Sequence, residues 1–242
     1  MSHDYDHITA HHYAAYRPPL HAQILALCLD ETKRFSRGLD VGCGTGQSSI
    51  ALAKYCDQVI GIEPSEDMRR IALAHPSVTY QTYDGVNLEF PGAYFDMLTF
   101  AGSLFYAKSQ RLLDEVVRVS KPAALVLAYD FDILLHKILH QLNISLPEDD
   151  HPYNHRENFS GLESSALVEL ANVMKSGTLQ LKSTELAHLL LSLKPVYKIL
   201  AARYNISDVY NVLVKELDQQ LSGNFHDLQV NLFYTMYQLR GE

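Results

Sequence analysis

The chain has 242 residues, 47% of them hydrophobic, and a formal net charge of −8. This length suits one large domain, or one domain with an insertion, and the apolar content is enough for a buried core. The acidic balance and the lack of a lysine or arginine run argue against an extended phosphate-backbone footprint. No apolar run reaches the length of about 18 residues that a membrane span requires. We therefore expect neither a nucleic-acid partner nor a membrane.

The cysteines and the first residues of the chain indicate the compartment. Cys28, Cys43 and Cys56 lack the C-x-x-C spacing. An odd number of cysteines in a chain of this size favours a reducing compartment over a disulfide framework. The first residues are polar and lack the apolar segment of a secretory signal. We therefore expect a cytoplasmic protein.

Strands and helices alternate through the middle of the chain. A first helix is expected after Pro18 and Pro19, where leucine and isoleucine recur at helical spacing. Strands that alternate with helices at such intervals favour right-handed βαβ units and a parallel sheet. The expected strands are 38–42, 58–62, 78–82, 94–100 and 124–129, and the expected helices between them are 48–55, 65–74 and a segment around 112–119.

The alternation of strands and helices breaks after residue 131. Helices are expected over 133–142 and 162–174, and in the second of these the apolar residues fall on one helical face. A short strand, 178–182, and further helical segments follow. Residues 228–236 alternate between apolar and polar side chains, which predicts a long final strand.

The most informative stretch is residues 39–46, in which an apolar segment runs into three glycines at alternate positions, Gly42, Gly44 and Gly46. Glycines at this density let the backbone approach a ligand closely and take positive φ angles without steric cost. A second apolar run ends in Glu63, whose side chain at a strand tip can accept both hydroxyls of a ribose. Together these features indicate a nucleoside-containing cofactor across the ends of two parallel strands.

The spacing of the glycines argues against a dinucleotide. A dinucleotide-binding turn needs G-x-G-x-x-G, and here the third glycine comes one residue early. Asp40 also places a negative charge where a phosphate-binding turn gains nothing from it. A cofactor with a cationic or zwitterionic tail fits better, which makes a nicotinamide oxidoreductase the disfavoured alternative.

These segments resemble the motifs of the class I S-adenosylmethionine-dependent methyltransferases, in the same order and spacing. The resemblance implies a Rossmann-like α/β fold, with a seven-stranded, mostly parallel sheet whose last strand is antiparallel and lies beside strand five. It also implies helices on both faces and a helical lid inserted after strand five. The segments that carry it are 39–46, 59–68, 83–90, 95–100 and 119–127, within residues 36–131.

The expected organisation is a single methyltransferase domain over residues 1–242. Its parts are an N-terminal segment and helix (1–35), a cofactor-binding core (36–131), a helical lid (132–176) and the strands and helices that complete the sheet (177–242).

The resemblance assigns roles to residues of the site. The glycine turn holds the methionine part of the cofactor, Glu63 the ribose and Asp84 the adenine amine. Asp40 lies near the ammonium, orients a bridging water or caps local backbone amides, and these alternatives stay open. The full expected cofactor set is Arg17, Asp40, Gly42, Cys43, Gly44, Gly46, Glu63, Pro64, Met68, Asp84, Gly85, Ala101 and Gly102.

No catalytic residue is assigned. A base is needed only if the acceptor is protonated at the working pH, and His12, His151 and His155 are candidates that the sequence does not rank. The pair His136 and His140, like the pair His151 and His155, lacks a companion cysteine or carboxylate pattern, so no metal is expected.

The expected function is S-adenosylmethionine-dependent methyl transfer to a small-molecule acceptor, by a monomer or a homodimer. The alternative is a protein of the same fold that binds S-adenosylmethionine or S-adenosylhomocysteine without methyl transfer, as a regulatory or partner module.

Overall fold

The structure is a computed structural model, and it describes residues 7–85, 87–147, 153–204, 208–221 and 223–241. The chain separates into two compact units, each assembled from three stretches of sequence. The core unit comprises Pro19–Asp132, Tyr153–Lys175 and Leu232–Glu242. The second unit comprises Met1–Pro18, Ile133–Pro152 and Ser176–Asn231. These stretches do not follow the boundaries 1–35, 36–131, 132–176 and 177–242 expected from the sequence.

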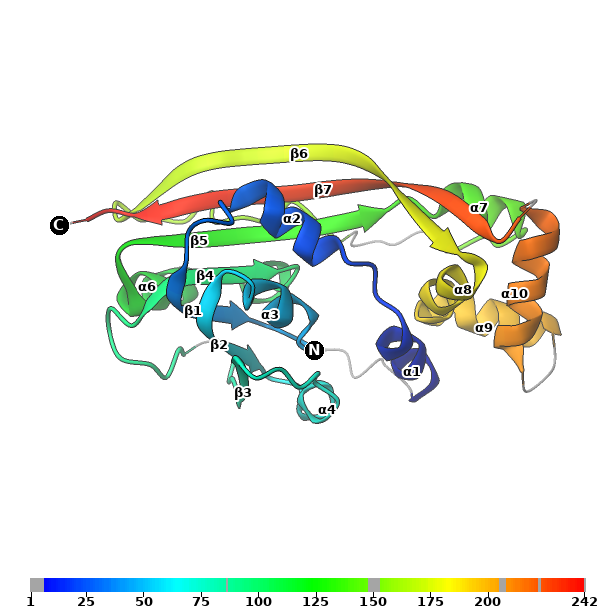
Figure 1. Cartoon of the computed structure of the whole chain (residues 1–242), viewed down its shortest axis with the longest axis horizontal. Coiled ribbons are helices and arrows are strands. Elements are labelled where there is room, and N and C mark those ends of the chain that lie inside the picture. The colour runs from blue at the N-terminus through cyan, green and yellow to red at the C-terminus, as the bar shows by residue number, and fades with distance from the viewer. Residues whose placement is uncertain (1–6, 86, 148–152, 205–207, 222, 242) are drawn as a thin grey trace. The chain divides into compact units, whose positions relative to one another are not determined.

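The strands form one seven-stranded sheet in the order β3-β2-β1-β4-β5-β7-β6. β1 pairs in parallel with β2 and β4, β2 with β3, and β4 with β5. Figure 1 shows β7 running opposite to β5 and β6. The expected Rossmann-like sheet, with an antiparallel last strand beside strand five, is confirmed. The bounds are β1 Phe35–Val41, β2 Cys56–Glu63, β3 Val78–Thr82, β4 Phe95–Ala101, β5 Ser120–Ile133, β6 Leu167–Lys182 and β7 Phe225–Leu239.

Ten helices are described. Serines cap two of them, since Ser65 Oγ accepts a hydrogen bond from Met68 N (3.3 Å) and Ser109 Oγ one from Leu112 N (3.2 Å). The bounds are α1 His7–Ala15, α2 Leu20–Cys28, α3 Gln47–Leu52, α4 Glu66–Arg70, α5 Leu104–Ala107, α6 Gln110–Val119, α7 His136–Gln141, α8 Ser183–Leu191, α9 Lys194–Tyr204 and α10 Val209–Gln220. In the described part of the chain, no helix combines the length and the apolar character needed to cross a membrane.

Helices cover both faces of the sheet in the core unit. Leu39 of β1 and Leu112 of α6 are fully or almost fully buried members of one hydrophobic cluster. The neighbouring position Gly38 points the other way, because successive residues of a strand face opposite sides. A Cβ on Gly38 would lie 3.0 Å from Leu52 Cδ2 of α3. The helices α3 and α6 therefore pack on opposite faces, as the resemblance implied.

The prediction of a helix over residues 162–174 is wrong. These residues lead into β6, the outermost strand of the sheet, which begins at Leu167. The side chains of Leu170 and Met174 are 48% and 52% exposed. The apolar residues whose spacing suggested a helix therefore do not form a buried face. Pairing with β7 decides the conformation, as tertiary context does for strands. Of the expected helical lid over 132–176, α7 is the helical part described, and the lid itself stays a prediction.

The helix after β2 is shorter than the expected 65–74. It ends at Arg70, and the Ala72 N–H turns back to Arg69 O at 3.1 Å. The next amide, Leu73 N–H, donates to Thr45 O at 3.1 Å instead of to a carbonyl of its own helix. This bond ties the end of α4 to the glycine turn that follows β1.

Candidate functional site

The glycine turn between β1 and α3 is held open by its backbone. Gly42, Gly44 and Gly46 have φ angles of 71°, 54° and 85°, in the region that favours glycine. The Gly42 N–H donates to Ile62 O at 2.8 Å, which fastens the turn to the end of β2. A Cβ on Gly42 would lie 2.4 Å from Ser103 Cβ, whereas a Cβ on Gly44 would meet no atom within 4 Å. The turn thus presents bare backbone at Gly44 to an open space.

Glu63 at the tip of β2 faces this turn. Its Oε2 accepts a hydrogen bond from Gly44 N at 3.0 Å, and its Oε1 accepts one from Ser65 N at 2.9 Å. The residue is 9% exposed. Each carboxylate oxygen has a second lone pair, so both oxygens keep the capacity to accept a ribose hydroxyl while the backbone fixes their position.

Asp40 lies fully buried beneath the turn. Its carboxylate accepts hydrogen bonds from Ser48 Oγ (2.6 Å), Ser49 Oγ (2.7 Å) and Thr99 Oγ1 (2.9 Å). Burial raises the pKa of Asp40, and the three hydroxyl bonds oppose that rise. The described donors are hydroxyls, not the backbone amides considered above, and they join β1, α3 and β4. Contact of Asp40 with the cofactor stays a prediction.

Three further expected residues lie near the same strand ends. Cys43 is buried, and burial raises the pKa of its thiol, so the sulfur is protonated and inert. Pro64 is exposed directly after Glu63, and Met68 is half-buried on α4. Their contacts with the cofactor stay predictions.

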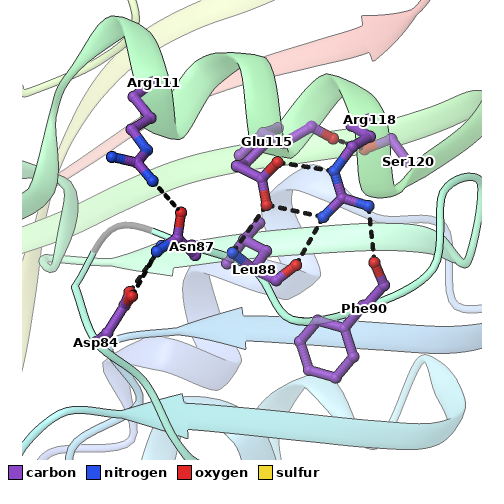
Figure 2. Close-up of polar contacts among 9 residues, drawn as sticks. Asp84, Asn87, Leu88, Phe90, Arg111, Glu115, Arg118 and Ser120 are labelled. Atoms are coloured by element: carbon purple, nitrogen blue, oxygen red, sulfur yellow. Dashed lines mark hydrogen bonds and ion pairs between the residues drawn. The ribbon is translucent and has the colours of Figure 1, made fainter.

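Asp84, the expected adenine partner, lies after β3 and binds Asn87 through both oxygens of its carboxylate. Its Oδ1 accepts a hydrogen bond from Asn87 N (2.7 Å) and its Oδ2 one from Asn87 Nδ2 (2.6 Å). Asn87 Oδ1 in turn accepts a hydrogen bond from Arg111 Nη2 of α6 (2.5 Å). Figure 2 shows this chain from the loop to the helix. The side chain is exposed, and Gly85 beside it has φ of 89° and open space around its Cβ position. Their contact with adenine stays a prediction.

The same loop is clamped a second time by α6, as Figure 2 shows. Glu115 Oε2 accepts a hydrogen bond from Leu88 N at 2.9 Å. Arg118 donates to Leu88 O and Phe90 O, both at 2.7 Å, and to both oxygens of Glu115 at 2.7 Å. The Arg118 bonds are the main reason that the pKa of Glu115 is lowered. Sequence reasoning missed this clamp, although a Glu and an Arg three positions apart share a helix face.

The end of β4, where the expected cofactor residues Ala101 and Gly102 lie, is equally constrained. Gly102 has φ of 72°, its N–H donates to Tyr129 O at 2.8 Å, and its carbonyl accepts a hydrogen bond from the Tyr153 hydroxyl. A Cβ at this position would lie 3.1 Å from the Tyr153 hydroxyl oxygen and 3.2 Å from Asp130 Oδ1. Ala101 before it is half-buried. Glycine is therefore needed here for close packing.

A hollow opens beside Gly102 within the core unit. Aromatic rings wall it: the centroid of Tyr153 lies 4.5 Å from that of Phe105 and 4.7 Å from that of His155. Its polar groups come from β5 and from the segment that follows residue 152. The lining residues are Phe100, Gly102, Leu104, Phe105, Tyr129, Asp130, Tyr153, Asn154, His155 and Glu157.

His155 and Asp130 form a pair in this hollow. His155 Nδ1 lies 2.9 Å from Asp130 Oδ2, and His155 Nε2 lies 3.9 Å from Asp132 Oδ1. Burial lowers the pKa of His155, but the hydrogen bond and the charge of Asp130, with Asp132 behind them, outweigh burial and leave that pKa raised. Of the three candidate bases, His155 is the one that the structure places beside the end of β4.

The other candidates lie elsewhere. His12 belongs to the second unit, where its Nδ1 is 2.9 Å from His188 Nδ1, and burial with the nearby His188 and His11 lowers its pKa to about 4. His151 lies outside the described residues. Arg17 also belongs to the second unit, where its guanidinium stacks 3.1 Å above the ring of Tyr13. Its expected contact with the cofactor carboxylate stays a prediction.

Comparison with known proteins gives a match over the part of the chain that holds the site. Residues 39–128, which include the glycine turn, Glu63, the Asp84 loop and Gly102, match a family model described as a methyltransferase domain. Over this segment the chain is therefore similar to a methyltransferase domain. The open backbone at Gly44, with the fixed Glu63 carboxylate beside it, fits S-adenosylmethionine, which is the cofactor of the domain.

Relatives share this domain over part of their length. The chain is 30% identical over 113 residues to a protein of Dictyostelium discoideum named as a methyltransferase. The aligned segment covers 43% of this chain and 42% of that protein. The chain is also 26% identical over 124 residues to the uncharacterized methyltransferase YcgJ of Bacillus subtilis. The aligned segment covers 47% of this chain and 49% of YcgJ. The match therefore spans less than half the length of these curated relatives.

Solved structures share the fold over nearly the whole chain. A structure from Anaeromyxobacter dehalogenans, named as that of a type II methyltransferase, superposes with a TM-score of 0.61 at 20% identity. It covers 93% of this chain and 97% of that one. At this identity the likeness establishes the methyltransferase fold.

Proposed function

We propose that the protein transfers the methyl group of S-adenosylmethionine to a small-molecule acceptor. The observation that carries the proposal is the Glu63 carboxylate fixed 3.0 Å from Gly44 N, beside bare glycine backbone that faces open space. The family model over residues 39–128 supports it. The cytoplasmic location and the monomeric or homodimeric state remain parts of this proposal.

The cofactor supplies a methyl group that its sulfonium already activates. The protein's own contribution is to bind, align and shield the reactants. Glu63 holds the ribose hydroxyls, and the glycine turn gives backbone contacts to the amino-acid tail. The clamp formed by Glu115 and Arg118 holds the loop that carries Asp84.

A small acceptor suits the end of β4. The hollow beside Gly102 is walled by close-packed aromatic rings, including Phe105 and Tyr153. A net charge of −8 with no basic run disfavours a nucleic-acid acceptor. The acceptor that we propose is therefore a small molecule and not a nucleic acid.

The test combines binding with transfer. S-adenosylhomocysteine affinity is measured by calorimetry, and methyl-labelled S-adenosylmethionine is incubated with the protein and a metabolite extract. Glu63→Ala should weaken binding about 100-fold, because hydrogen bonds to a charged group contribute about 1.5–3 kcal/mol each, and it should abolish labelling. Glu66→Ala is the matched control, since that side chain is 76% exposed on α4 and pairs with Arg70.

Two results would contradict the proposal. Unchanged affinity in Glu63→Ala would place the cofactor elsewhere. Tight cofactor binding without label in any extract component would favour a binding module that does not transfer methyl groups.

A further inference from the structure

We propose that Tyr80 of β3 is a positioning residue for the cofactor: its ring and its hydroxyl hold the glycine turn and the α4 connection in the arrangement that binds S-adenosylmethionine. The α4 connection is the stretch of chain from Glu63 to Leu73, which contains α4. The inference rests on the proposed binding of the cofactor at the glycine turn, and it adds a residue of the neighbouring strand that acts through that turn.

The ring of Tyr80 lies across the neighbouring strand. Tyr80 and Gly61 are register partners in the parallel pair formed by β3 and β2. A Cβ on Gly61 would lie 2.9 Å from Tyr80 Cδ1, which is shorter than the roughly 3.5–4.0 Å at which carbon atoms pack. The glycine therefore leaves the room that the ring needs to pass over β2 toward α3.

The hydroxyl end of Tyr80 reaches the glycine turn. Gly46 is the N-cap of α3, and its φ angle is 85°. A Cβ on Gly46 would lie 2.0 Å from Tyr80 Oη and 2.6 Å from Tyr80 Cζ. The hydroxyl therefore occupies the position that a side chain on Gly46 would take, and it limits movement of the turn toward β3.

The same hydroxyl is hydrogen-bonded to the end of the α4 connection. It donates to Leu73 O at 2.8 Å. The Leu73 N–H donates to Thr45 O at 3.1 Å, and Thr45 directly precedes Gly46 in the turn. Tyr80, Leu73 and the turn thus form a closed set of contacts, in which each part restrains the other two.

The α4 connection is fastened to two consecutive residues of the turn. Its first residue, Glu63, accepts the Gly44 N–H at 3.0 Å. Its last residue, Leu73, is bonded to Thr45, the next position of the turn. The second fastening is the one that the Tyr80 hydroxyl supports. Loss of that support should let the end of the connection move while the Glu63 end stays in place.

The Tyr80 hydroxyl keeps its proton near neutral pH. Burial raises the pKa of Tyr80 to about 12, and the nearby Cys43 and Asp40 act in the same direction. The hydroxyl therefore stays a donor to Leu73 O, and the restraint that it provides does not titrate in this range.

A restraint of this kind acts on the protein before the cofactor binds. Glycine has more accessible backbone conformations than any other residue. A turn with three glycines that lacked a restraint would populate conformations that do not bind. The apparent affinity falls in proportion to the fraction of molecules that are competent to bind. Tyr80 therefore contributes to affinity by keeping the free turn in its binding conformation.

The first experiment removes the hydroxyl and leaves the ring. Calorimetry of full-length Tyr80→Phe with S-adenosylhomocysteine should show an affinity about 2–10-fold below that of the wild type, the change that one neutral hydrogen bond supports. Tyr94→Phe is the matched control and should bind like the wild type. Tyr94 is also a half-buried tyrosine of the core unit, but it directly precedes β4, at the other end of the strands from the turn.

Hydrogen exchange separates positioning from folding. In Tyr80→Phe the amide of Leu73, which donates to Thr45 O, should exchange faster than in the wild type. The amides of the paired strands β1 and β4 should keep their wild-type rates. A general loss of stability would instead raise exchange at both places, because it acts through global unfolding.

A double-mutant cycle tests the contact with Gly46. Gly46→Ala should weaken S-adenosylhomocysteine binding in the wild-type background, because the new Cβ meets the Tyr80 hydroxyl. In the Tyr80→Ala background this collision is absent, so the same substitution should cost at least about threefold less affinity. Equal losses in both backgrounds would show that Tyr80 does not hold the turn.

Two further results would overturn the inference: equal affinities of Tyr80→Phe and Tyr94→Phe, or a loss of affinity with faster exchange throughout the core unit. If either occurs while Glu63→Ala still weakens binding, the proposed cofactor site and methyl transfer stand and only the role of Tyr80 falls. If Glu63→Ala also leaves the affinity unchanged, the proposed site itself falls.

Discussion

The glycine turn and the hollow beside Gly102 lie at one edge of the sheet but are built in opposite ways. The turn is made of backbone: Gly42 N–H bonds to Ile62 O, Gly44 N–H bonds to Glu63, and the residues come from adjacent strands. The hollow is made of side chains such as Asp130, His155 and Glu157, which come from separate stretches of the chain.

This difference separates binding from chemistry. A backbone site depends on the absence of side chains and on a conformation that glycine alone adopts freely, so most substitutions there damage binding. A side-chain site changes its chemistry when one residue changes, while the scaffold stays intact. Substitutions in the turn should therefore alter cofactor affinity, and substitutions in the hollow should alter turnover.

After Glu63→Ala, the largest effect is expected at Gly44. Gly44→Ala places a Cβ in the open space where we propose that the cofactor binds, and the left-handed conformation adds a cost of about 1–2 kcal/mol. We expect affinity for S-adenosylhomocysteine to fall about 30-fold by calorimetry. Gly177→Ala is the control, since its Cβ would make an ordinary 3.7 Å contact with Val230. Equal affinities in the two variants would contradict a cofactor above Gly44.

The next effect concerns the clamp on the Asp84 loop. Arg118→Ala removes the bonds to Leu88 O and Phe90 O and leaves Glu115 without its partner. We expect a loss of about 2 kcal/mol in the free energy of unfolding, and a fall in Tm of about 4–8 °C for a chain of this size.

Affinity for S-adenosylhomocysteine should fall about 5–10-fold in the same variant, because the loop loses its fixed position. Arg34→Ala is the control, since its ion pair with Asp57 is exposed and contributes at most about 1 kcal/mol. A stability loss with unchanged affinity would show that the clamp serves the fold and not the site.

The smallest effect is a shift in pH dependence. The hydrogen bond and the charge of Asp130, with the charge of Asp132, outweigh burial and raise the pKa of the His155 ring above the ordinary value of 6.5. We expect an NMR titration of the His155 ring to show a midpoint above 6.5. Asp130→Asn should move that midpoint to lower pH. Affinity for S-adenosylhomocysteine should not follow this titration, and a parallel change would contradict the separation of turn and hollow.

Sequence reasoning succeeded where a feature is local. The strand 78–82 has the bounds of β3, and the helix expected from residue 65 begins where Ser65 caps α4, because both features depend on neighbouring residues. It failed over 162–174, where Leu170 and Met174 mimic a helix face on an edge strand. The partner strand, β7, lies far along the chain, and no local pattern reports it.

By itself, the sequence determined the glycine turn, the acidic strand tip and hence the cofactor class, since a Cβ-free bend and a carboxylate nearby need no distant partner to be recognised. Only the tertiary structure decided which histidine stands in the hollow. Asp130 lies on β5 and His155 lies 25 positions further along, so their contact exists only after the chain has folded. Pairs of this kind depend on where strands end in space, which residue spacing does not encode.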